Sequence, residues 1–236
     1  MKTWTTRSPR ASNRWVVVVA AALFAATLFA EVAAAHEVPK VPADFDPPAP
    51  GTYSLERIMQ APDGRIVDAN SKRGQLAAYT HGKVTLLSLM YTACSDETGC
   101  PLAFYTIDMI KRDLEKSKAA RGRVQVVSLS FDPEHDTPEV MRAYGGKHVK
   151  GGSPVPWHFL TAASKRELAP MLDGFGQDVS KAARGQADKE LVHVLKLFLI
   201  DKEGWVREIY STSYLIPQVV VNDIKTLLIE DGVKVN

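Results

Sequence analysis

The most reactive side chains of this chain are its two cysteines, Cys94 and Cys100, which are the first and last residues of a seven-residue segment. The segment follows an apolar run, Val84–Met90, and ends at Pro101, where a helical pattern begins. This arrangement delivers two thiols from a strand to the start of a helix. The helix dipole and its unpaired N–H groups favour thiolate, the form that attacks disulfides and binds metals. The pair is therefore the predicted active site.

The alternative interpretation of the cysteine pair is a structural disulfide that only crosslinks a surface loop. A ring this small removes little entropy from the unfolded chain, so stapling alone would add little stability. Since the chain has no other cysteine, one intramolecular disulfide is possible, and we expect it to form reversibly. We also expect a thiol pKa below the free value of about 8.5, in particular for Cys100 beside Pro101.

The N-terminal segment has the pattern of a secretory signal. A basic head without acidic residues is formed by Lys2, Arg7, Arg10 and Arg14. The apolar run Trp15–Ala30 has 16 residues, fewer than the roughly 20 that usually span a bilayer. Ala33–Ala35 then offers the small residues of a cleavage site.

We predict a signal peptide over residues 1–35, with cleavage after Ala35. An uncleaved anchor, which would tether the protein to a membrane through residues 15–30, is the alternative. Export to the periplasm or its equivalent would place the cysteines in a compartment that tolerates disulfides, where free thiols need a thiol reductant or a metal.

The charge balance excludes one class of partner. The signal holds four of the 29 basic residues and one of the 27 acidic ones, Glu31, which leaves 25 against 26. The formal charge of +2 therefore belongs to the signal, and the mature chain is nearly neutral. No basic cluster survives, so nucleic acid is not an expected partner.

The remaining roughly 200 residues suit one domain with a full core. Residues 36–50 contain five prolines and few apolar anchors, which predicts an extended tether before a domain over residues 51–236. The domain begins with an expected hairpin of Tyr53–Gln60 and Arg65–Asp68, turning at Pro62–Gly64.

Strands and helices are expected to alternate after the hairpin. The expected strands are 83–90, 123–131, 157–160, 194–200 and 205–210, and the expected helices are 101–117, 137–146, 164–172 and 217–230. The near-continuous apolar run at 123–131 is typical of a strand covered on both faces. This order predicts an α/β sandwich around a mixed sheet. Neither a phosphate-binding loop nor a dinucleotide fingerprint occurs in the sequence.

Four segments, in order, match the motifs of one family. They are Tyr91-Thr92-x-Cys94 with Cys100-Pro101, Ser128–Glu139 (SLSFDPEHDTPE), Trp157–Thr161 (WHFLT), and Val192-His193 before Leu197–Asp201. They resemble the "YTxC…CP", "SxDPExDTP" and "WxxLT" motifs and the ligand-histidine region of the Sco/SenC family. The resemblance covers about residues 51–230.

The resemblance implies a thioredoxin-like fold in exported, often membrane-tethered proteins. Family members bind one copper through two cysteines and a histidine, and assist assembly of the CuA centre of cytochrome c oxidase. On this basis Cys94, Cys100 and His193 are the expected metal ligands, for Cu(I) with Cu(II) as a second state. The implied partners are a copper-accepting protein, such as cytochrome c oxidase subunit II, and a thiol reductant.

The donor chemistry agrees with this expectation. Two thiolates and one imidazole form a soft, low-coordinate set that selects Cu(I) over hard cations. A structural zinc site would need four ligands, whereas ligand count leaves a catalytic zinc site open. Taken alone, a histidine between valines at a strand start is typical of a packed core residue. His193 lies 93 positions after Cys100, so only the fold can join them, and we expect it where thioredoxins have a cis-proline.

The chain departs from the family at two places. Five residues separate Cys94 from Cys100 where the family has three. Val192 and Val194 flank His193 where the family often has Asp and Ser. We therefore expect a less preorganised loop, and an imidazole without an orienting carboxylate from its neighbours.

Two other functions compete with copper delivery. A metal-independent thiol–disulfide oxidoreductase would use Cys94 and Cys100 as its catalytic redox pair. A thiol peroxidase is disfavoured, because Thr92-Ala93-Cys94 lacks the Pro-x-x-x-Thr-x-x-Cys context of peroxiredoxins.

Two aspartates and the other histidines complete the candidates. Asp132 and Asp136 would form an acidic outer-shell pair or, as we favour, a turn and the cap of the next helix, in which Thr137 is the other capping residue. His36 would be the mature N-terminus and a weak Cu(II) chelator. Surface or packing positions are expected for His81, His135, His148 and His158.

Overall fold

The computed structural model describes Met1 and residues 46–94, 96, 99–181, 191–211 and 214–235. The predicted signal peptide and cleavage site, and His36, lie outside the described residues, apart from Met1. Within the described ranges, no helix has the length and apolar character needed to cross a membrane.

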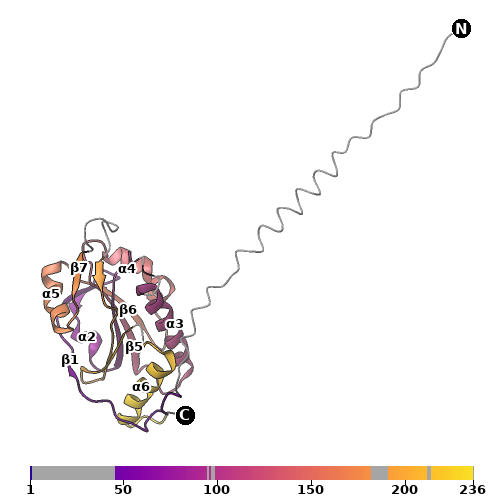
Figure 1. Cartoon of the computed structure of the whole chain (residues 1–236), viewed down its shortest axis with the longest axis vertical. Coiled ribbons are helices and arrows are strands. Elements are labelled where there is room, and N and C mark those ends of the chain that lie inside the picture. Colours follow the sequence, from indigo (N-terminus) through magenta and orange to yellow (C-terminus); the bar gives the residue numbers. More distant parts are fainter. Residues whose placement is uncertain (2–45, 95, 97–98, 182–190, 212–213, 236) are drawn as a thin grey trace. The chain divides into compact units, whose positions relative to one another are not determined.

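The described chain alternates strands and helices (Figure 1). The strands are β1 (Met59–Gln60), β2 (Arg65–Asp68), β3 (Arg73–Gln75), β4 (Val84–Met90), β5 (Val124–Ser130), β6 (Trp157–Thr161), β7 (Val179–Lys181), β8 (Leu191–His193), β9 (Leu197–Ile200) and β10 (Trp205–Tyr210). The helices are α2 (Ala77–Thr80), α3 (Cys100–Lys116), α4 (Pro138–Gly145), the 3-10 helix η1 (Gly146–Lys150), α5 (Lys165–Gly174) and α6 (Pro217–Glu230).

Eight of the strands in the described residues form one mixed sheet, in the order β1-β10-β9-β4-β5-β6-β2-β3. The central strands β4, β5 and β6 are parallel, and the flanking pairs are antiparallel. In Figure 1, α3 and α6 lie on one side of the strands and α2 and α5 on the other. The predicted α/β sandwich around a mixed sheet is confirmed.

Burial explains why the centre of the sheet forms where it does. Every residue of β4 and β5 is buried, as their near-continuous apolar sequences predict for strands covered on both faces. One covering helix is α3, which buries apolar side chains at helical spacing: Ala103, Ile107, Ile110 and Leu114. The buried pair of β4 and β5 therefore positions the cysteine loop, which follows β4.

Helix starts follow local capping signals. The Thr137 hydroxyl accepts the Val140 N–H at 3.4 Å at the start of α4. The Ser164 hydroxyl accepts the Glu167 N–H at 3.3 Å at the start of α5. Thr137 is therefore the N-cap of α4, rather than Asp136, the other capping candidate.

The predicted pairing of Tyr53–Gln60 with Arg65–Asp68 is wrong. Only β1 forms from the first segment, and it pairs with β10, whereas β2 pairs with β3 and β6 at the opposite side of the sheet. An N-terminal hairpin does exist, but β2 and β3 form it. The N-terminal segment follows β10 because the Ile58 N–H donates to the Val206 carbonyl and the Arg207 guanidinium donates to the Leu55 and Glu56 carbonyls.

The expected strand 194–200 is also shorter than predicted. Residues Leu191–His193 form β8, which pairs with β7 in a separate two-stranded sheet, and β9 begins only at Leu197. The polar stretch after α5 supplies β7, which the sequence pattern did not indicate.

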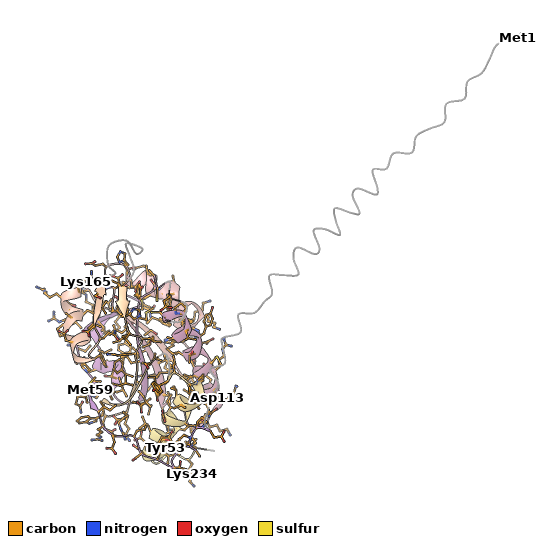
Figure 2. All side chains as sticks on the ribbon, viewed as in Figure 1. Met1, Tyr53, Met59, Asp113, Lys165 and Lys234 are labelled. Carbon is orange, nitrogen blue, oxygen red and sulfur yellow. The ribbon has the colours of Figure 1, made fainter. Side chains whose placement is uncertain are left out.

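The described end of the Pro-rich segment contacts α6. The Pro48 carbonyl accepts from the Asn222 amide at 2.9 Å, and the Gly51 N–H donates to the Thr226 hydroxyl at 3.0 Å. The Tyr53 hydroxyl donates to Asp223 at 2.5 Å. In Figure 2, Tyr53 and Lys234 are both labelled toward the lower end of the domain. Residues 48–53 are therefore attached to the domain, and a free tether is possible only before them.

Arg207 generates the first prediction. Its guanidinium, 9% exposed, pairs with buried Asp201 at 3.0 Å and with Glu230 at 2.9 Å. Replacing Arg207 by Met leaves Asp201 buried without its cation, so we expect the free energy of unfolding, measured in urea, to fall by about 3–5 kcal/mol.

Arg65→Met is the matched control. The Arg65 side chain is 75% exposed and lies 3.9 Å from Glu167, so the same change there should cost less than about 1 kcal/mol. Equal losses for the two variants would contradict the assigned role of Arg207.

Candidate metal and thiol site

The two cysteines lie at the end of the central strand, on either side of a tight turn. Cys94 follows β4 and is partly buried, whereas Cys100 is the first residue of α3 and 2% exposed. The Gly99 N–H donates to the Asp96 carbonyl at 2.9 Å and closes the turn between them. Of the five intervening residues, Ser95, Glu97 and Thr98 lie outside the described part. The longer spacing still keeps the two sulfurs within 4.8 Å of each other.

His193 reaches the cysteines through the pairing of β9 with β4. This pairing is antiparallel, with Leu197 opposite Ser88, so the start of β9 lies beside the end of β4. His193, four positions before Leu197, then places its Nε2 3.7 Å from the Cys100 Sγ. The donor atoms of Cys94, Cys100 and His193 all lie within 4.8 Å of one another. The three residues that the sequence predicted as ligands are therefore together.

The orientation of the imidazole comes from the backbone. His193 Nδ1 lies 3.1 Å from the Leu191 carbonyl, which can only accept, so Nδ1 carries the proton. Nε2 is then free to accept from the Cys100 thiol or to bind a metal. A ligand histidine usually donates its other N–H to a carboxylate, a carbonyl or water. The Leu191 carbonyl thus replaces the neighbouring carboxylate that Val192 and Val194 cannot supply.

Two aromatic rings enclose the imidazole. The Tyr91 ring meets His193 edge-on with centroids 5.5 Å apart, and the Phe131 ring lies 4.8 Å away. Tyr91 and Phe131 follow the ends of β4 and β5 and are both buried. They exclude water from one side of the site.

Asp136 holds the start of the cysteine loop. Its carboxylate, 1% exposed, accepts the Thr92 N–H at 3.0 Å, the Thr92 hydroxyl at 2.5 Å and the Ser130 hydroxyl at 2.5 Å. Asp132, in contrast, contacts His135 at 2.8 Å in the turn that follows β5. Of the two aspartates, Asp136 is therefore the one that contacts the start of the cysteine loop. The favoured interpretation of Asp136 as a helix cap is wrong, because its carboxylate oxygens accept from Thr92 and Ser130 instead.

The protonation of Cys100 differs from the sequence expectation. Burial, as the largest cause, raises the pKa of the Cys100 thiol to about 12, and nearby Cys94 raises it further. The expected lowering at Cys100 is wrong, because the cost of removing the thiolate from water exceeds the gain from the helix start. Burial likewise raises the pKa of Tyr91 to about 12.

The other described histidines occupy surface or packing positions, as expected. His81 and His135 are exposed, and His148 Nε2 lies 3.4 Å from Asp108, where burial lowers the pKa of the imidazole. His158 packs edge-on against Tyr79 with centroids 5.0 Å apart. None of these four lies in the group of three metal donors.

Sequence reasoning missed several contacts of the site. Tyr91 was visible in the "YTxC" motif, but nothing indicated its contact with His193. Neither the Leu191 carbonyl nor the Gln177 amide, described below, has a sequence signal, because each acts through a contact between distant segments.

Comparison with known proteins identifies the class of protein that this fold and site define. The sequence model of the SCO1/SenC family matches residues 65–229, and the chain belongs to this family. A SCO1 protein homolog of Bacillus subtilis (strain 168) is 27% identical over 181 residues, which cover 75% of this chain and 84% of the relative.

Solved structures confirm the thioredoxin-like fold. Arabidopsis thaliana ScoI, solved with copper bound, has a TM-score of 0.60 at 19% identity and covers 72% of this chain and 98% of its own. BsSco, described as a member of the Sco family of cytochrome c oxidase assembly proteins with a disulfide switch, has a TM-score of 0.58 at 19% identity. It covers 75% of this chain and 98% of its own.

The unequal burial of the thiols generates the second prediction. In the reduced, metal-free protein, iodoacetamide should alkylate Cys100 in a Cys94→Ser variant at least about tenfold more slowly near neutral pH than Cys94 in a Cys100→Ser variant. Thiolate is the nucleophile, so the Cys100 rate should keep rising as pH approaches its pKa of about 12. Equal rates for the two variants would show that burial does not control the thiols.

Proposed function

We propose that this protein binds one copper ion, as Cu(I), through Cys94, Cys100 and His193 and delivers it to a copper-accepting protein. The convergence of two sulfurs and one imidazole nitrogen within 4.8 Å is the observation that carries the proposal. The recipient, by family resemblance, is the CuA-bearing subunit II of cytochrome c oxidase. The Arabidopsis relative was solved with copper bound, which supports the choice of metal.

The donor set fits a soft ion. Two thiolates and an imidazole favour Cu(I) over hard cations such as magnesium or calcium. At the bond lengths known for zinc, about 2.0–2.3 Å, three donors arranged trigonally around one ion lie about 3.5–4.0 Å apart. The distance of 3.7 Å between Cys100 Sγ and His193 Nε2 fits this range, and the limit of 4.8 Å for the set requires an inward movement of at most about 1 Å.

The protonation of Cys100 makes metal capture release protons. In the metal-free protein, burial keeps Cys100 a neutral thiol, and only the charge of a metal compensates for a buried thiolate. Nε2 is the nitrogen that His193 offers to the metal, since Nδ1 donates to the Leu191 carbonyl. Cys94, the more exposed sulfur, is the donor that an acceptor protein reaches first.

Export and reduction complete the proposal. The signal predicted over residues 1–35 would send the protein to the periplasm or its equivalent, with residues 15–30 as a membrane tether if cleavage does not occur. In that compartment the two sulfurs would oxidise to a disulfide, which no longer offers thiolate ligands. A thiol reductant is therefore a required partner before copper binding.

A metal-independent oxidoreductase is the second candidate. Partly exposed Cys94 would attack a substrate disulfide and form a mixed disulfide, and the Cys100 thiolate, losing its proton to solvent, would displace the substrate. The substrate leaves with two thiols, and the pair becomes a disulfide that an external dithiol reduces. The sulfur spacing of Cys94 and Cys100 and the disulfide switch ascribed to BsSco favour this candidate. It gives His193 no essential role.

Cu(I) titration against a competing chelator without oxygen is the third prediction. The reduced protein should bind one Cu(I), and the disulfide form none tightly. Cys94→Ser and Cys100→Ser should each abolish tight binding, because at most one thiolate remains. His193→Ala should weaken binding less, since both thiolates remain.

The same variants separate the two candidates. An oxidoreductase would lose disulfide reduction in an insulin assay with either cysteine replaced, show no specific Cu(I) site and depend little on His193. His158→Ala is the matched control for His193→Ala, because His158 packs against Tyr79 away from the donors. Copper binding that survives all three ligand substitutions would overturn the metal assignment.

The fourth prediction concerns processing. Mass spectrometry of the exported protein should give a mature chain that begins at His36, because Ala33–Ala35 supplies the cleavage site. An intact segment from Met1 through Ala30 on the exported protein would instead indicate a membrane anchor.

A further inference from the structure

The ligand histidine lies on a small and weakly supported part of the fold. His193 ends β8, which among the described strands pairs only with three-residue β7, outside the eight-stranded sheet. An isolated two-stranded sheet is marginally stable in water. Contacts from outside this pair must therefore hold the segment that carries His193.

The first such contact comes from Tyr91. The Leu191 N–H donates to the Tyr91 hydroxyl at 3.4 Å, while the Leu191 carbonyl accepts from His193 Nδ1 at 3.1 Å. The Tyr91 ring also packs edge-on against the imidazole. One side chain at the end of β4 thus contacts both the ring of His193 and the residue that sets its tautomer.

The second contact comes from Gln177, on the other side of His193. Its Nε2 donates to the Val194 carbonyl at 3.2 Å and to the Asp178 carbonyl at 3.1 Å. Two carbonyl acceptors fix which end of the amide is nitrogen. Gln177 is 5% exposed, and its Oε1 has no hydrogen-bond partner within the described structure. Leaving a buried oxygen unpaired is unfavourable, so the amide is present for the bonds that it donates.

We propose that Tyr91 and Gln177 are positioning residues for His193, which hold Leu191 and Val194 so that the imidazole keeps its proton on Nδ1 and presents Nε2 to the two sulfurs. Neither residue is itself a metal donor. Tyr91 acts through Leu191 and through its contact with the imidazole ring, and Gln177 acts through the Val194 carbonyl. The inference deepens the proposed function and rests on it for its effect on copper. Its effect on the tautomer of His193 does not depend on copper.

The experiment uses Tyr91→Phe, which removes one oxygen, and Gln177→Leu, which removes both donated bonds. Two-bond ¹H–¹⁵N NMR spectra of the reduced, metal-free protein report the histidine tautomers, and His193→Ala assigns the signal of His193. The wild-type protein should show the Nδ1–H form in alkaline buffer. Both variants should show a mixture with the Nε2–H form, because Tyr91→Phe releases Leu191 and Gln177→Leu releases Val194, which lie on either side of His193.

Cu(I) affinity is the second readout. Loss of a group that orients a metal ligand typically lowers metal affinity by about 10–100-fold, and we expect about tenfold for each variant. Matched controls remove the same groups elsewhere. Tyr53→Phe removes a phenol bonded to Asp223, and Gln125→Leu removes a buried amide that donates to the Tyr79 carbonyl at 2.6 Å. Both controls should keep the wild-type tautomer and affinity.

The outcomes separate the two proposals. Wild-type protein that binds no Cu(I) would refute the copper function, while the tautomer would still decide the role of Tyr91 and Gln177. Variants that keep the Nδ1–H form and the wild-type affinity would overturn the positioning inference, as would equal changes in the controls. Should Gln177→Leu fail to fold, Tyr91→Phe alone decides the result.

Discussion

The antiparallel pairing of β9 with β4 is the constraint on which the site depends. It brings the start of one strand beside the end of the other, with Leu197 opposite Ser88. The chain that leaves β4 carries the cysteines, and the chain that enters β9 carries His193. Residues 93 positions apart therefore become neighbours, and a shift in this register would separate the imidazole from the sulfurs.

Burial is the second influence on the site, and it opposes the helix start. The start of α3 favours a thiolate at Cys100, but the same position packs the sulfur into the core and raises the pKa of the thiol to about 12. Desolvation is the larger effect because it removes the whole hydration of the charged form. The pair is thus asymmetric, with a partly exposed Cys94 and a protonated, buried Cys100. Near neutral pH, the buried Cys100 therefore remains a thiol in the metal-free protein.

Strong local signals predicted much of the fold. The buried runs of β4 and β5 and the helices α3, α4, α5 and α6 each appear close to where the sequence indicated. The pairing of Tyr53–Gln60 was wrong, because chain proximity and a turn sequence favour a hairpin while the acceptors of the Arg207 guanidinium lie in that segment. The strand at β8 was missed because its partner, β7, lies in a polar stretch without alternation.

The sequence by itself determined the class of chemistry. Two thiols at a helix start and the four family motifs predicted the three residues that the structure brings together and the thioredoxin-like fold, since residue types and local spacing carry that information. Only the tertiary structure decided how the site works. In the folded protein, the Leu191 carbonyl accepts the imidazole proton in place of a neighbouring carboxylate, and Asp136 binds the start of the cysteine loop. Burial keeps Cys100 a neutral thiol. Each of these results depends on burial or on hydrogen bonds between distant segments. Local sequence predicts neither of them, because both arise only when the chain has folded.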